Sequence, residues 1–254
     1  MLAPALSKPY QVARRLCYRR ARTLVAQTGD TEAWMRERFP ATPIAVVPNP
    51  INLPLRATEP VLDPASVVGQ SRNIILSVGR LDPQKRHDRA IDAFAAIAES
   101  HPNWDLVILG DGAERTALSD QIARQDLGNR IHMPGFAGNL GDWYRRAQML
   151  VMPSAYEGFP NVLVEAMAHD LPTISFDIKS GPRDITADGR RGILLPDADH
   201  VTTLSQAMER LIRDPEELHS LGEKAGEVRE AYSLEIVLQM WTDLLHQAMT
   251  RTGS

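Results

Sequence analysis

From residue 72 onward, short apolar runs alternate with longer segments in which apolar residues recur at helical spacing. The apolar runs are Ile74–Val78, Leu106–Leu109, Arg130–Met133, Met149–Met152, Thr173–Phe176 and Gly192–Leu195. The first helical segment places Ala90, Ile91, Phe94, Ile97 and Ala98 on one face. Strands that alternate with helices form a parallel sheet with helices on both faces. The sequence therefore predicts an α/β protein with a doubly wound, Rossmann-like sheet, which binds ligands at the carboxyl ends of its strands.

The rest of the chain divides around this region. Before it we expect a helix over Gln11–Ala21, a strand over Thr23–Ala26, a helix from its cap Asp30 through Phe39, and a strand over Ile44–Val47. These elements contain too little apolar sequence for a core of their own, and the prolines that follow indicate an extended linker. The predicted parts are an N-terminal remnant of another domain (1–48), the linker (49–71), a ligand-binding domain (72–232) and a last helix (233–254).

The last helix carries an apolar stripe. Ser233 is expected to cap the helix. The stripe consists of Val237, Met240, Trp241, Leu244, Leu245 and Ala248. Because such a stripe usually faces a core, we expect it to pack back against residues 1–48.

Charge and cysteine content limit the class of protein. The single cysteine, Cys17, excludes an internal disulfide and fits a reducing, cytoplasmic setting. The net charge is −4, but residues 1–22 hold six basic and no acidic side chains, which leaves −10 for the remainder. A basic helix over residues 8–22 can lie against an anionic surface such as the inner membrane, or it can be the cationic outer face of an ordinary helix. The acidic remainder argues against nucleic-acid binding.

Loops at two predicted strand ends carry glycines and cations. Gly79 allows a close turn after the first strand, and Arg80 and Lys85 place two cations at the open end of the sheet. Such cations stabilise a diphosphate, whose charge grows as a glycosidic phosphate bond breaks. The alternative is a surface turn with scattered cations. Gly110, after the second strand, begins a turn that lacks the third glycine of a dinucleotide fingerprint, so we expect no NAD site.

A third loop joins a strand to a helix between two glutamates, Glu157 and Glu165. The residues after Glu157 are Gly158, Phe159, Pro160, Asn161 and Val162. The helix start would offer free backbone N–H groups to an anion, and Glu165 lies about one and a half turns into the helix. One carboxylate could reach hydroxyls on one side of a bound diphosphate and the other could reach hydroxyls beyond it. The alternative is a solvated helix with two surface glutamates.

The runs VGRLDPQK, LGDG, PGF, PSAYEGFPNVLVEAMA and DGRRGILLP, in this order, resemble the donor-binding half of a family 4 retaining glycosyltransferase of the GT-B fold. The resemblance extends over roughly residues 44–250. It implies that Arg80 and Lys85 bind the diphosphate of a nucleotide sugar, that Glu157 faces the transferred sugar and that Glu165 binds the ribose. It also implies backbone contacts from residues 159–162 and a donor that binds without a metal or other cofactor.

Other polar motifs have simpler explanations. Asp197 and Asp199 match a D-x-D metal motif, but Asp199 is also a suitable cap for the next helix, and we expect no metal. His87 and His169 have no partner at catalytic spacing. The segment Ser180–Asp184 resembles the family's loop near the donor sugar, where it could influence sugar choice or simply begin a helix.

The family's acceptor-binding domain precedes the donor half, and only its last elements match residues 1–48. The resemblance implies transfer of a hexose or N-acetylhexosamine, from a nucleotide sugar such as a UDP-sugar, to a glycan or lipid-linked acceptor with retention of configuration. One alternative is a catalytically inactive nucleotide-sugar-binding module or fragment that lacks the acceptor domain. Another is a sugar-nucleotide epimerase, although the sequence supplies no acid–base set for it.

Overall fold

The predicted apolar runs assemble into one parallel, six-stranded sheet in the computed structural model, which describes residues 8–250. The strands are β3 (Asn73–Val78), β4 (Trp104–Leu109), β5 (Ile131–Gly135), β6 (Met149–Met152), β7 (Thr173–Phe176) and β8 (Ile193–Leu195). They lie in the order β5-β4-β3-β6-β7-β8, with Leu76 opposite Val107 on one side and Leu150 on the other. The predicted doubly wound α/β class is confirmed.

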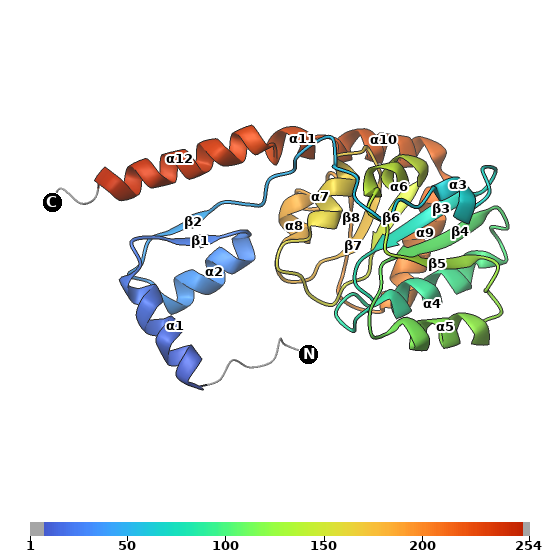
Figure 1. Cartoon of the computed structure of the whole chain (residues 1–254), viewed down its shortest axis with the longest axis horizontal. Coiled ribbons are helices and arrows are strands. Elements are labelled where there is room, and N and C mark those ends of the chain that lie inside the picture. The colour runs from blue at the N-terminus through green and yellow to red at the C-terminus, as the bar shows by residue number, and fades with distance from the viewer. Residues whose placement is uncertain (1–7, 251–254) are drawn as a thin grey trace.

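Helices cover both faces of this sheet (Figure 1). They are α3 (Pro64–Val67), α4 (His87–Ala98), α5 (Arg115–Arg124), α6 (Leu140–Arg146), α7 (Asn161–Met167), α8 (Pro182–Ile185), α9 (His200–Arg213), α10 (Pro215–Ala225) and α11 (Val228–Ala231). Alternate strand residues point to opposite faces. Ile75 therefore joins a core with α4, α5 and α9, whereas Ile74 and Leu76 join a core with α6, α7 and α11. The predicted apolar face of α4 is fully buried.

The direction of winding reverses between β3 and β6. From β3 the chain proceeds to β4 and β5 on one side, and from β6 it proceeds to β7 and β8 on the other. In open α/β sheets the usual ligand position is the crevice at such a reversal, which here is the edge where the loops after β3 and β6 begin.

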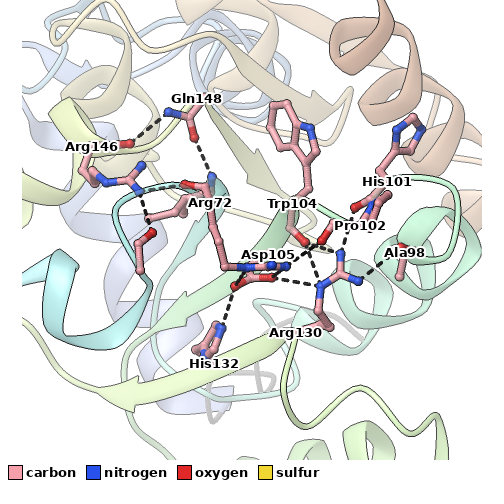
Figure 2. A network of polar contacts seen from close by, with 12 residues as sticks. Arg72, Ala98, His101, Pro102, Trp104, Asp105, Arg130, His132, Arg146 and Gln148 are labelled. Atoms are coloured by element: carbon pink, nitrogen blue, oxygen red, sulfur yellow. Dashed lines mark hydrogen bonds and ion pairs between the residues drawn. The ribbon is translucent and has the colours of Figure 1, made fainter.

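The opposite, amino end of the sheet is closed by a buried ion network (Figure 2). The Asp105 carboxylate on β4 is 1% exposed and accepts hydrogen bonds from Arg72 (2.7 Å), Arg130 (3.0 Å) and His132 (3.0 Å). Burial alone would raise the pKa of Asp105, but the bonds from Arg72, His132 and Arg130 outweigh burial and lower it. The carboxylate therefore stays charged and ties together the starts of β3, β4 and β5.

The N-terminal segment forms a smaller unit beside this domain (Figure 1). Its elements are α1 (Lys8–Arg20), β1 (Leu24–Ala26), α2 (Gly29–Arg38) and β2 (Ile44–Val46), and β1 pairs with β2 in parallel. The predicted cap of α2 was wrong. Thr28, rather than Asp30, caps the helix by accepting a hydrogen bond from the Thr31 N–H at 3.2 Å. The Asp30 side chain instead accepts one from the backbone of Ser180.

The last helix, α12 (Leu234–Thr250), runs back over the N-terminal segment (Figure 1). Ser233 caps it as predicted, by accepting a hydrogen bond from the Ile236 N–H at 3.2 Å. The helix contacts the N-terminal segment, since Arg22 Nη1 donates to the Ala248 carbonyl at 3.4 Å. Most of the expected apolar stripe is nevertheless not buried, because Val237 is the one residue of α12 that is buried in the described chain. Trp241 and Leu245 are among the exposed large apolar side chains.

One further expectation concerns the region before α9. Asp199 occupies the N-cap position of α9, but its side chain makes no capping bond, while Asp197 pairs with His200 at 2.7 Å. The predicted capping role of Asp199 is therefore corrected. Among residues 8–250, no helix is both long and apolar enough to cross a lipid bilayer.

Candidate functional site

The crevice at the carboxyl end of the sheet is centred on an ion pair between the β3 and β6 loops. Lys85 Nζ lies 2.8 Å from Glu157 Oε1, and Ser154 Oγ donates to the same oxygen at 2.7 Å. The Lys85 side chain is 18% exposed and that of Glu157 is 6% exposed. A nearly buried carboxylate requires such partners. The structure therefore brings together two of the predicted site residues from loops 72 residues apart.

The backbones of the same two loops are also joined. The Gln84 side chain donates to the carbonyl of Tyr156 at 2.9 Å, and the Ala155 N–H donates to the carbonyl of Gln84 at 2.8 Å. These bonds fix the distance between the two loops. The loop after β3 and the loop after β6 are therefore held side by side.

Glycines after β4 let the β3 loop approach closely. Gly110 has φ +145°, and a Cβ there would lie 1.9 Å from the carbonyl oxygen of Gly79. A Cβ on Gly112 would lie 2.4 Å from the Leu81 carbonyl oxygen. A side chain at either position would push the β3 loop outward. Gly110 therefore supports the loop that carries Gly79, Arg80 and Lys85.

Arg80 is the exposed cation of the crevice. Its side chain is 75% exposed, and Nη2 lies 3.1 Å from Asp82 Oδ2. An exposed pair of this kind adds little stability. The guanidinium is therefore accessible to a ligand, and its role in binding a diphosphate stays a prediction.

The turn after Glu157 leads into the short helix α7. Phe159 packs against Tyr232 with ring centroids 6.0 Å apart, and Asn161 accepts a hydrogen bond from Asn49 at 3.1 Å. A Cβ on Gly158 would meet nothing within 4 Å, so the turn is open at that point. Pro160 makes no side-chain capping bond to α7, and Val162 is half-buried. The backbone of the turn is therefore accessible at Gly158, whereas Phe159 and Asn161 are held by contacts with Tyr232 and Asn49.

Glu165 lies in a different environment from Glu157. Its Oε2 accepts a hydrogen bond from the Tyr144 hydroxyl at 3.0 Å, and its carbonyl oxygen lies 2.8 Å from His169 Nδ1. Burial raises the pKa of Glu165, and the bond from Tyr144 only partly offsets this effect. The carboxyl borders a hollow of about 290 Å³ with the linker residues 49–56. Glu157 and Glu165 therefore have different partners and surroundings, and their predicted roles toward sugar and ribose stay predictions.

His87 is buried beneath the β3 loop and is 3% exposed. Its Nδ1 lies 3.1 Å from Ser77 Oγ, and burial lowers its pKa to about 4. The imidazole is therefore neutral at physiological pH, and it packs under the loop instead of entering the crevice.

Three residues of this site escaped the sequence reasoning: Ser154, Tyr144 and Asn49. Ser154 lies three residues before Glu157, a spacing at which a hydroxyl can reach a carboxylate, so a local signal for it existed. Tyr144 and Asn49 come from α6 and the linker. No local pattern links either of them to α7.

The comparisons with known proteins decide the family. The sequence profile described as "Glycosyl transferases group 1" matches residues 61–228, which is well over half of the chain. The chain belongs to the group 1 glycosyl transferases. The expected family relationship is thereby confirmed, whereas assignment to family 4 stays a prediction.

Curated relatives of this glycosyl transferase chain are longer than the chain itself. It is 33% identical over 231 residues to an exopolysaccharide phosphotransferase of Streptomyces coelicolor, covering 90% of this chain and 24% of that protein. It is 28% identical to the amylovoran biosynthesis glycosyltransferase AmsD of Erwinia amylovora, covering 91% and 64%. The chain thus spans less than two thirds of either relative.

Solved structures of similar fold include glycosyl transferases. The sucrose-phosphate synthase of Thermosynechococcus elongatus superposes with a TM-score of 0.84 and 25% identity over 99% of this chain and 65% of that one. Anabaena HepE, solved in complex with UDP-glucose, superposes with a TM-score of 0.80 and 21% identity over 93% and 67%. These likenesses agree with the predicted GT-B architecture.

Proposed function

We propose that this chain binds a nucleotide diphosphate sugar, most simply a UDP-sugar, and provides the donor site of a hexosyl- or N-acetylhexosaminyltransferase. The observation that carries the proposal is the ion pair of Lys85 and Glu157 at the point where the sheet reverses direction. The family match and the UDP-glucose complex of HepE, a protein of the same fold, support it.

In this proposal the diphosphate lies beside Lys85 and Arg80. The Lys85 ammonium has three N–H donors, so it can keep its bond to Glu157 and still donate to a phosphate oxygen. Negative charge grows on the leaving diphosphate as the bond to the sugar breaks, and the two cations stabilise that charge. The chemistry so described requires neither a metal nor another cofactor.

Glu157 is assigned to the transferred sugar and Glu165 to the ribose. Ser154 and Lys85 hold Glu157 in one orientation, from which its second oxygen can accept hydrogen bonds from sugar hydroxyls. Backbone groups from Gly158 to Val162 would contact the sugar and the phosphates. Transfer to a glycan or lipid-linked acceptor, with retention of configuration as in family 4, completes the proposal.

Titration calorimetry with UDP and UDP-glucose tests the donor assignment. We expect Arg80→Ala and Glu165→Ala each to weaken binding by about ten-fold, the loss of one charged hydrogen bond. Arg213→Ala is the matched control, because Arg213 is also an exposed arginine paired with a carboxylate, but lies at the end of α9. Binding that is indifferent to both site substitutions would contradict the assignment.

A second candidate is a nucleotide-sugar-binding module without transferase activity. It is favoured by the fact that the crevice loops carrying Arg80, Lys85 and Glu157 all belong to the sheet domain. Donor binding without transfer to any candidate acceptor, and without donor hydrolysis, would select this module. Product formation would exclude it.

The same proposal places the protein in the cytoplasm, at the inner membrane surface. The α1 helix has no acidic residue in its first turn, and Arg15, Arg19 and Arg20 are exposed on it. Anionic lipid attracts such a helix by about 1 kcal/mol per cation near the surface. Co-sedimentation with anionic but not zwitterionic vesicles is the expected result, and equal recovery with both would contradict it.

A further inference from the structure

The first turn of α2 lies against the loop that precedes α8, although about 150 residues separate them (Figure 1). The Gly29 N–H donates to Asp184 Oδ2 at 2.7 Å, and the Ser180 N–H donates to Asp30 Oδ2 at 2.9 Å. Thr31 Oγ1 lies 3.4 Å from Ser180 Oγ. The α2 helix therefore supplies the Asp30 carboxylate to a backbone N–H of the loop before α8, and α8 itself supplies the Asp184 carboxylate to a backbone N–H of α2.

The position of these carboxylates suits the end of a helix. The first N–H groups of α2 have no partner within the helix and carry partial positive charge. Asp184 satisfies one of them from outside, while Asp30 lies in the first turn of α2. The partial positive charge at the amino end of α2 therefore stabilises both carboxylates. Such a contact is more specific than non-specific contact between polar surfaces.

The loop before α8 in turn presses on the turn assigned to the donor sugar. Ser180 and Gly181 both have positive φ, +72° and +114°. A Cβ on Gly181 would lie 2.5 Å from Pro160 Cδ and 3.7 Å from Thr28 Cγ2. Gly181 is therefore wedged between the cap of α2 and the turn that follows Glu157.

A second set of hydrogen bonds connects the N-terminal segment to the turn after Glu157 through the linker residue Asn49. The Gln27 amide donates to Asn49 Oδ1, and Asn49 Nδ2 donates to Asn161 Oδ1 at 3.1 Å. Gln27 directly precedes the cap of α2, and Asn161 directly follows Pro160. The end of β1 is consequently connected to the donor turn both through the loop before α8 and through the linker.

We infer that Asp30 and Asp184 are positioning residues for the donor site. By fixing the loop before α8 against Pro160, they hold residues 157–161 in the shape that receives the sugar and diphosphate. The inference rests on the proposed function for the identity of the ligand. It adds that the N-terminal segment, and not only the sheet domain, sets donor affinity.

The test compares Asp184→Ala with Asp184→Asn and with Asp188→Ala. Asparagine keeps a side-chain oxygen for the Gly29 N–H, so it should rescue much of the wild-type behaviour. Asp188 is an exposed carboxylate of the same region that pairs with Arg183 and not with α2, which makes it the matched control. Two quantities are measured: amide hydrogen exchange of the peptide spanning 157–165 without ligand, and the Kd for UDP.

We expect Asp184→Ala to accelerate exchange in this peptide and to raise the Kd by about five-fold, the loss of one hydrogen bond. Asp188→Ala should change neither quantity. The inference would be overturned if Asp184→Ala left the exchange of this peptide unchanged. It would also be overturned if Asp184→Ala left the Kd for UDP unchanged. Accelerated exchange in a chain whose wild type binds no UDP would support the positioning contact and count against the proposed function alone.

Discussion

The two ends of the parallel sheet use charged side chains in opposite ways. At the amino end, Asp105 is buried and receives hydrogen bonds from Arg72, Arg130 and His132. At the carboxyl end, Glu157 pairs with Lys85, and Arg80 on the same loop as Lys85 is largely exposed. The first arrangement leaves the carboxylate saturated with donors, whereas the second leaves cationic donors free to meet an anion.

Stability and binding thus depend on different ends of the same sheet. A saturated buried network holds strand starts together, and it offers nothing to a ligand. An unsaturated pair in a crevice contributes less to folding but can exchange partners when a charged ligand arrives.

Asp105→Asn should lower the free energy of unfolding by about 3 kcal/mol. The substitution leaves the charges of Arg72 and Arg130 without their carboxylate. The loss is expected at the lower end of the range for buried pairs because Arg72 is partly exposed. Chemical denaturation measures it, and the Kd for UDP should not change.

Asp170→Asn is the matched control for Asp105. Asp170 pairs with Arg229 at 2.7 Å, and both side chains are about half exposed. Exposed pairs contribute at most about 1 kcal/mol. Equal losses for the two substitutions would contradict the distinction between a saturated buried network and a surface pair.

Acidification should destabilise the protein through His87. Its pKa is about 4 in the folded chain, against 6.5 when unfolded, because burial disfavours the charged imidazole. Between these values the unfolded chain binds the extra proton, so stability falls as the pH is lowered from 6.5 towards 4, by about 2 to 3 kcal/mol. Denaturation at several pH values should show this slope in the wild type. His87→Gln should flatten it, and an unchanged slope would contradict the assignment.

Lys85→Met should weaken UDP binding by about twenty-fold, the loss of one hydrogen bond between charged groups. It should also lower stability, since Glu157 would remain nearly buried without its cation. The double variant Lys85→Met, Glu157→Gln should recover stability but not binding. Recovery of both quantities, or of neither, would show that this pair does not separate folding from binding in the way described.

The smallest effect concerns Glu165. Burial raises its pKa, so the folded state holds the proton more tightly than the unfolded chain does. Glu165 therefore adds to the free energy of unfolding below its unfolded pKa, and this stabilisation is lost as the pH rises through its folded pKa. Asp105 has the opposite pH dependence, because its folded pKa is lowered. Glu165→Gln should remove this decline from the stability profile above pH 4.5. A profile identical to that of the wild type would contradict the raised pKa.

Much of the fold could be predicted because each strand of the sheet has a recognisable local sequence pattern. Buried parallel strands appear in the sequence as apolar runs. The last residue of each run lies at the carboxyl edge of the sheet, where ligands bind. Lys85 and Glu157 could therefore be placed together from sequence, although they are 72 residues apart. The ends of the predicted strands differ from the observed ones by only a few residues.

The remaining features depend on contacts that no local pattern encodes. Thr28 caps α2, whereas the Asp30 carboxylate, which the sequence suggested as the cap, accepts a hydrogen bond from Ser180, about 150 residues away in the chain. Tyr144 reaches Glu165 only because α6 packs beside α7. The network of Asp105 is formed by isolated polar residues from separate elements, each of which looks like an ordinary strand or loop residue in sequence.

Amide hydrogen exchange of the whole chain, with and without UDP-glucose, compares ligand protection at the two ends of the sheet. We expect slower exchange with ligand at the carboxyl end, in residues 79–85 and 154–165. We expect no change at the amino end, in residues 100–105 and 128–132. Protection at the amino end, or no protection in either carboxyl-end loop at a saturating concentration of ligand, would contradict this expectation.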